Sequence, residues 1–214
     1  MSVKAGPKIV KEGLIFDLDA AVSRSYSGSG DTAYNLIGGI SATLLNGTGY
    51  SSANKGCWSF DGTNDGINTT INIDNDPISI NAWVYCTEVT SVNGRGIVLS
   101  DNGGWDRGLE INDSTWGVHT GNSLYKVGTA LNNTWYNTYL SYNSNVWTLY
   151  VNGVFVFSAS SVTSPGSLAT IGRADYFSTR IFQGLIPQVQ IYNRALSAQE
   201  ISQNFNATRD RYGI

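Results

Sequence analysis

The segment from Trp147 to Phe157 constrains the fold of this chain most strongly. Two runs of aromatic and β-branched residues flank the pair Asn152-Gly153, which suits a two-residue turn with positive φ angles. This pattern predicts an antiparallel hairpin. The same alternation of apolar and polar residues recurs in segments 79–85, 135–141 and 185–192. We therefore predict an all-β fold, an antiparallel β-sandwich.

Further strands are expected between clusters of Gly, Asn, Asp and Ser, at the spacing typical of sandwiches. They are predicted at residues 13–20, 57–60, 67–73, 95–99, 107–111, 116–120 and 124–128. In the third of these, Ile67, Thr69, Ile71 and Ile73 share one face. Segments 23–34 and 47–55 lack apolar periodicity and are predicted as loops.

The pattern changes only near the C-terminus. Ser197 and Glu200 have the spacing of a capping box, which predicts a short helix over 197–207. Leu196 and Ile201 have the spacing of a hydrophobic staple, and Phe205 extends the apolar face of this helix. With 214 residues and no linker, we predict a loosely held arm at 1–12 and one domain at 13–214 that includes the helix.

Charge argues against several classes of partner. Charged residues make up 14% of the chain, against roughly 25% in ordinary domains, and the net charge is −3 without a basic run. Nucleic acid and anionic membranes are therefore not expected as partners. No apolar segment is long enough to span a bilayer, and the first ten residues lack a signal-peptide core, so we expect a protein made in a cytoplasm.

The two cysteines, Cys57 and Cys86, each lie in a predicted strand beside core-like residues. Reduced buried cysteines are the common case for a chain made in a cytosol. We expect two free thiols, with a disulfide as the alternative.

With these segments in order, the chain resembles the laminin-G-like, concanavalin A-like jelly-roll domains of the lectin and glucanase superfamily. The resemblance rests on Ser59–Asp65, on Ser79–Val84 with its central Trp83, on the hairpin, and on Ile191–Ser197. It implies a jelly-roll sandwich over most of the chain from Gly13 onward. Many members carry two acidic residues where this chain has Pro187 and Gln188, so no role of those acids is transferred.

A narrower resemblance is to stand-alone jelly-roll virion proteins of tailed phages. It rests on the opening segments Gly13–Ala21 and Ser25–Gly30 and on the closing segment Asn204–Ile214. It implies a virion protein, made in the host cytoplasm, whose partners are other virion proteins and glycans of the host surface. A homo-oligomer is also expected, because particles are symmetric.

Residues that could catalyse are few. His119 is the only histidine, lies in an alternating run, and is interpreted as a structural strand residue. Glycoside hydrolysis needs two carboxylates on one face, and the nearest match, Glu110, is followed on that face by Asn112 and Ser114. We interpret this segment as a solvated strand edge and predict no catalytic residue and no enzyme activity.

Sugar binding requires an aromatic face with polar groups at its edge. The loop 101–107 provides this combination, and a second loop at 173–176 provides a weaker one. An alternative is that Trp105 folds onto the core. The predicted carbohydrate-binding residues are Asn102, Trp105, Asp106, Arg107 and Tyr176.

Asp61, Asn64 and Asp65 surround Gly62 in a turn-rich segment. Their oxygens have the chemistry that Ca²⁺ prefers, and we expect this turn as the candidate calcium site. The same pattern also forms turns that hold no metal.

The sequence therefore predicts a non-catalytic jelly-roll protein that decorates a phage virion and binds host-surface glycans. An architectural protein that binds only other virion subunits, a free lectin and, more distantly, a glycoside hydrolase are the alternatives.

Overall fold

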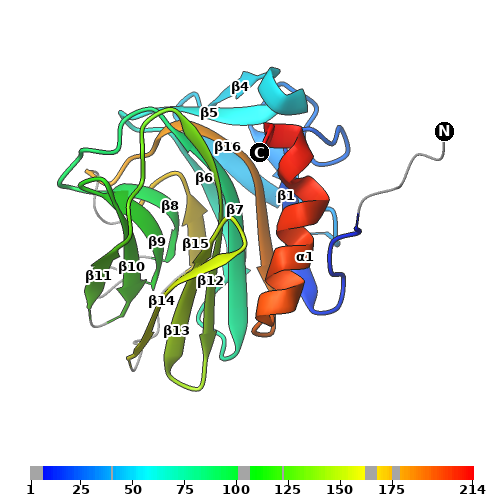
Figure 1. Ribbon diagram of the computed structural model, residues 1–214. Helices are drawn as coiled ribbons and strands as arrows, with labels where there is room; N and C mark the ends of the chain where they lie inside the picture. Colours follow the sequence, from blue (N-terminus) through cyan, green and yellow to red (C-terminus); the bar gives the residue numbers. More distant parts are fainter. Residues whose placement is uncertain (1–6, 40, 101–106, 122, 162–167, 175–178) are drawn as a thin grey trace.

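The computed structural model describes residues 7–39, 41–100, 107–121, 123–161, 168–174 and 179–214, which form two stacked antiparallel sheets (Figure 1). The first sheet has the order β14 (Val154–Ser160), β13 (Val146–Val151), β12 (Thr134–Asn143), β7 (Ile78–Cys86), β16 (Gln183–Tyr192), β5 (Cys57–Asp61) and β4 (Gly49–Ser51), and β1 (Leu14–Asp19) also pairs with β16. The second has the order β11 (Leu124–Val127), β10 (Thr115–Thr120), β9 (Arg107–Asn112), β8 (Arg95–Ser100), β15 (Leu168–Ile171), β6 (Gly66–Asn72), β3 (Ser41–Leu45) and β2 (Thr32–Tyr34). The predicted all-β sandwich is confirmed.

The hairpin β13–β14 is formed as predicted. Asn152 and Gly153 have φ angles of 51° and 74°, and the strands resume pairing directly at Val151 and Val154. Positive φ at both turn positions matches the right-handed twist of the flanking strands. The local sequence therefore sets the register next to the turn, and a bulge shifts the register between Tyr150 and Leu149.

The alternation of each strand determines what enters the core. Ile67, Thr69 and Ile71 of β6 and Ile73, just after its end, are all buried, as predicted for one face. Trp58, Trp116 and Trp147 come from both sheets and belong to the same buried cluster. Burial of such large rings supplies much of the hydrophobic stabilisation.

Two segments predicted as loops contain short structure, so those predictions were wrong in part. Segment 23–34 ends in β2, and segment 47–55 contains β4 and the 3₁₀ turn η1 (Ala53–Lys55). β2 and β4 have three residues each and lie at the ends of their sheets. Strands this short carry no detectable periodicity, and only their neighbours define them.

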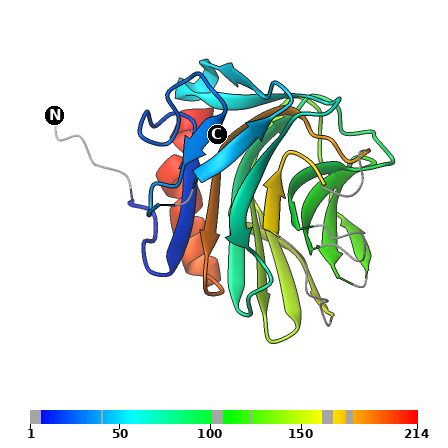
Figure 2. The ribbon, with the colours of Figure 1, turned by 180° about the vertical axis from the view of Figure 1, so that it is seen from behind.

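The helix α1 (Ala198–Thr208) and the 3₁₀ turn η2 (Arg209–Tyr212) end the chain. Both bonds of the predicted capping box are present between Ser197 and Glu200. Figures 1 and 2 show α1 against the outer face of the first sheet, with the second sheet on the opposite side. Trp83 stacks on Tyr212 with ring centres 3.9 Å apart and on Phe205 at 6.0 Å, so aromatic contacts dock the C-terminal region.

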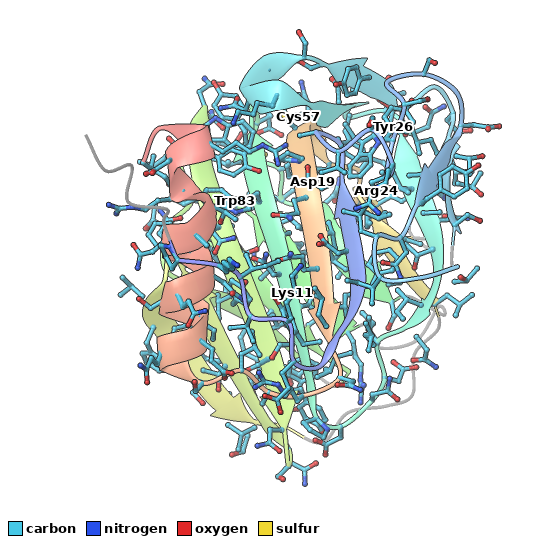
Figure 3. All side chains as sticks on the ribbon, turned by 90° about the vertical axis from the view of Figure 1, so that its right-hand side faces the viewer. Lys11, Asp19, Arg24, Tyr26, Cys57 and Trp83 are labelled. Atoms are coloured by element: carbon cyan, nitrogen blue, oxygen red, sulfur yellow. The ribbon has the colours of Figure 1, made fainter. Side chains whose placement is uncertain are left out.

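The segment before β1 is attached more firmly than we predicted for an arm at 1–12. The amide of Val10 donates to Asn204 at 2.7 Å, and Gln203 donates to the carbonyl of Lys8 at 2.7 Å. Ile9 and Val10 also pack on the cluster under α1. Figure 3 shows the segment that carries Lys11 crossing the outer face of the first sheet.

Cys57 and Cys86 are free and buried, as predicted. They belong to β5 and β7, which pair with opposite edges of β16. Within the described ranges, no helix is both long and apolar enough to cross a membrane.

Candidate functional site

The predicted carbohydrate-binding residues Asn102, Trp105, Asp106 and Tyr176 lie outside the described residues. Arg107 is described and begins β9. It is 4% exposed. Its guanidinium carbon lies 5.2 Å from the ring centre of Tyr142, and its Nη1 donates to the carbonyl of Ile73 at 3.3 Å. The guanidinium therefore bridges the two sheets, and a sugar contact by Arg107 stays a prediction.

The turn proposed for calcium uses its own carboxylates as hydrogen-bond acceptors. Asp61 Oδ1 accepts from the amide of Thr63 at 2.7 Å, and Asp65 Oδ2 accepts from the amide of Asp61 at 2.9 Å. The carbonyl of Asn64 accepts from Asn46 at 2.7 Å. Burial, aided by the nearby Asp61 carboxylate, raises the pKa of Asp65. Binding of calcium at this turn stays a prediction.

The clearest concentration of polar chemistry lies on the outer face of the second sheet. Leu109 and Ile111 of β9 point into the core, so Glu110 and Asn112 point away from it. Glu110 is nevertheless 0% exposed, and Asn112 is 4% exposed. Our interpretation of this segment as a solvated edge was wrong, because other parts of the chain cover this face.

Arg180 and Ile181, which follow β15 in the chain, form part of the cover. The amide of Gly96 donates to the carbonyl of Arg180 at 3.3 Å, and Arg95 donates to the carbonyl of Ile181 at 3.0 Å. A Cβ atom on Gly96 would lie 3.0 Å from the carbonyl oxygen of Arg180. The absence of a side chain at Gly96 thus lets the two segments approach closely.

Glu110 is the centre of a buried polar cluster. Its Oε2 lies 3.1 Å from Nε2 of His119 and 3.7 Å from Nε of Arg180, and its Oε1 accepts from Asn112 at 2.8 Å. His119 is a buried residue of β10, which agrees with the structural role predicted for it. The cluster places one cation and two polar groups beside the carboxylate, which offsets part of the cost of burying its charge, although Glu110 Oε2 itself accepts no hydrogen bond from the residues that the structure describes.

Gly94 and Gly117 both lie close to the Glu110 side chain. A Cβ atom on Gly94 would lie 2.4 Å from Glu110 Oε2, and one on Gly117 would lie 2.7 Å from Glu110 Cγ. Gly117 pairs directly with Glu110 across the strands. The two glycines make room for the carboxylate within the sheet face, where Glu110 is 0% exposed.

This geometry has a chemical consequence. A general acid or a nucleophile of a glycosidase must reach the scissile bond and work with a second carboxylate. Glu110 is enclosed, and in the described part of the chain no second carboxylate contacts it. The described residues also contain no group of three or more His, Cys, Asp or Glu side chains arranged to hold a metal ion.

Sequence reasoning missed this cluster because its members are far apart in the chain. The register places His119 opposite Gly108 and Gly117 opposite Glu110, which brings the histidine and the carboxylate to one face. Arg180 joins from beyond β15. The only signal for this cluster in the sequence was the pair of glycines, Gly94 and Gly117, that make room for Glu110.

Solved structures share this fold. A Trypanosoma rangeli sialidase in complex with 2,3-difluorosialic acid matches with a TM-score of 0.76 and 17% identity, over 98% of this chain and 36% of the sialidase. The same sialidase in complex with the inhibitor DANA matches with a TM-score of 0.73 and 16% identity, over 92% of this chain and 33% of the sialidase. The binding domain of botulinum neurotoxin serotype D matches with a TM-score of 0.66 and 16% identity, over 90% of this chain and 51% of that domain.

These similarities concern the fold, and this chain spans only part of each neighbour. Among curated proteins, none matches the sequence. A family model described as the concanavalin A-like lectin/glucanases superfamily matches residues 61–202, more than half of the 214 residues. The matched range runs from the end of β5 into α1 and includes most strands of both sheets. The chain therefore belongs to the concanavalin A-like lectin/glucanases superfamily.

Proposed function

We propose that this protein is a non-catalytic carbohydrate-recognition module that decorates a phage particle. The proposal that the protein is non-catalytic rests on the burial and the contacts of Glu110. This carboxylate is on the sheet face where an alternating pair of acids would be needed, yet it is enclosed and held by His119, Asn112 and Arg180. A group in this position stabilises the face and does not exchange protons with a substrate.

Recognition of sugars is supported by family and composition. The superfamily includes lectins, and structures of one sialidase neighbour were solved with sialic acid and with 2,3-difluorosialic acid. Only 14% of residues are charged, while Asn, Ser, Thr and Gly are abundant. Neutral hydroxyl and amide groups can bond to sugar hydroxyls without desolvating a charge. Trp105 is the proposed aromatic contact in the loop 101–107.

A glycan array tests the proposal. We expect saturable binding by the wild type, loss of part of that binding in Trp105→Ala, and no change in Tyr34→Ala, which removes an exposed aromatic ring from β2. Incubation with β-glucans should release no reducing sugar. Release of reducing sugar, abolished in Glu110→Gln, would contradict the non-catalytic proposal.

The virion placement is supported by the resemblance of segments 13–30 and 204–214 to phage jelly rolls. Cryo-electron microscopy of purified particles tests it. We expect ordered copies of the sandwich on the capsid or tail, bound to other virion proteins. Particles that lack this density would leave a free lectin as the function.

A further inference from the structure

A groove lies on the outer face of the first sheet, beside the N-terminal end of α1. Its volume is about 420 Å³, within the range of small-molecule sites. One wall comes from the adjoining strands β12 and β13 and the other from the connection between β16 and α1 (Figure 1). The lining residues are Ser141, Asn143, Ser144, Val146, Thr148, Tyr150 and 195–198.

Strand pairing arranges hydroxyl groups along the floor. Ser141 pairs with Thr148, and Thr148 pairs with Ser158 of β14, so three hydroxyls cross the sheet in one row. Within the described part of the chain, the side chains of Ser141 and Thr148 form no hydrogen bond with another residue. These hydroxyls are therefore available to a ligand, and each can both donate and accept.

An aromatic pair lies next to the hydroxyl row, at the following position on the same face of β13. Tyr150 lines the groove, and its pairing partner Phe155 is 55% exposed on β14. The two rings meet edge to face with centres 5.8 Å apart. An aromatic ring that lines a groove beside hydroxyl and amide groups matches the two sides of a sugar ring, which presents C–H groups on one side and hydroxyls at its edge.

The charges in and around the groove indicate whether its ligand is charged or neutral. The lining contains no acidic or basic side chain. Beside the lining, Asp76 Oδ1 accepts from the amide of Ser144 at 3.0 Å, so the charge at this rim is negative. Arg194 and Glu200 bind each other, with Arg194 Nη1 3.0 Å from Glu200 Oε2. This pairing holds the pKa of Glu200 at about 2. The groove therefore offers no cation to a sialic acid or a phosphate, and its chemistry suits an uncharged ligand.

We infer that this groove binds a neutral oligosaccharide, with Tyr150 as the stacking residue and Ser141, Asn143 and Thr148 as hydrogen-bonding residues. The inference rests on the proposed carbohydrate-recognition function and adds to it a site on the first sheet, whereas the described residue Arg107 begins β9 of the second sheet. Two sites on one module would increase avidity for a repeating polysaccharide.

The test compares variants at the two sites on an array of neutral gluco-, galacto- and manno-oligosaccharides and their sialylated counterparts, followed by calorimetry. Thr148→Arg fills the groove, and Asn143→Lys adds bulk and charge at an exposed position of its rim. We expect each to weaken binding of a neutral oligosaccharide at least about tenfold, and Tyr150→Ala to do the same. Thr43→Arg, at an exposed position of β3 in the other sheet, is the matched control and should bind as the wild type does.

The outcomes separate the two proposals. Neutral glycans that still bind to Thr148→Arg and Asn143→Lys but not to Trp105→Ala would overturn the groove and leave the proposed function intact. A wild type that binds no glycan would overturn both. Melting curves of each variant identify any loss of folding, and Asn143→Lys, being at an exposed strand end, keeps the test valid if Thr148→Arg does not fold.

Discussion

Asp17 is an acidic residue that is almost completely buried. It lies on the outer face of β1, is 4% exposed, and accepts from Gln188 at 3.2 Å. It forms part of a buried polar layer on this sheet, in which Asn81 donates to Gln190 at 3.0 Å and accepts from Asn137 at 2.7 Å. Burial is the main cause that raises the pKa of Asp17 from 3.8 to about 6, and it outweighs the hydrogen bonds that the carboxylate accepts.

This pKa makes stability depend on pH in a defined direction. Between pH 3.8 and about 6 the unfolded chain has lost the Asp17 proton while the folded chain retains it. The free energy of unfolding should therefore fall across this interval, by up to about 3 kcal/mol from this residue. Asp17→Asn should remove the fall and be more stable than the wild type at pH 7. Urea titrations at several pH values measure the free energy of unfolding of both proteins, and Asp31→Asn, at an exposed position, is the control. Parallel pH profiles of wild type and Asp17→Asn would contradict the prediction.

The two thiols are predicted to be unreactive in the native state. Burial raises the pKa of Cys57 to about 12 and that of Cys86 to about 11. Because the thiolate is the nucleophile, iodoacetamide at pH 8 should label neither residue in the folded protein and both in guanidinium chloride. Mass spectrometry counts the labels. A label on either cysteine without denaturant would show that the native strands open.

At the scale of elements, the hairpin β13–β14 shows how a local turn also serves tertiary packing. Gly153 has a φ of 74°, and a Cβ atom there would lie 3.2 Å from Cδ1 of Phe205 in α1. The glycine thus adopts the positive φ that the turn requires, and its lack of a side chain allows the helix to pass close to the turn. One residue contributes to both a hairpin and the packing of the C-terminal helix.

Gly153→Ala should destabilise the protein by more than the φ strain alone. Strain at a positive φ costs roughly 1–2 kcal/mol, and the ring of Phe205 must also move. Gly30→Ala is the matched control, because Gly30 has a φ of 86° and a Cβ atom there would meet nothing within 4 Å. Chemical denaturation gives both losses. Equal losses would mean that the contact with Phe205 adds no cost.

At the scale of the whole molecule, calcium at the turn 61–65 is testable through melting temperature. A ligand that binds only the folded state stabilises by about 2.7 kcal/mol at a hundred times its dissociation constant, which raises the melting temperature by roughly 5–10 °C in a chain of this size. Addition of CaCl₂ should produce this rise, EDTA should reverse it, and Asp61→Asn should abolish it. An unchanged melting temperature would exclude calcium from this turn.

Much of the fold could be predicted because its determinants are local. The turn at Asn152-Gly153 and the cap at Ser197 and Glu200 need only their own neighbours to form, and both are present. The candidate site was less predictable. Glu110 lies in a segment with the alternation of a solvated strand, and nothing adjacent in the sequence indicates that Arg180 meets the carboxylate or that the carboxylate is buried.

The sequence by itself determined the all-β class, most strands, the hairpin and the capped helix, because period-two alternation, φ preferences and capping act within a few residues. Only the tertiary structure decided which outward-facing groups are dry. It buried Asp17 and Glu110, attached the segment at 8–10 to α1, and formed the groove from segments 141–150 and 195–198. The physical reason is that burial and cavities depend on which distant segments meet, and that is a property of strand order and helix docking.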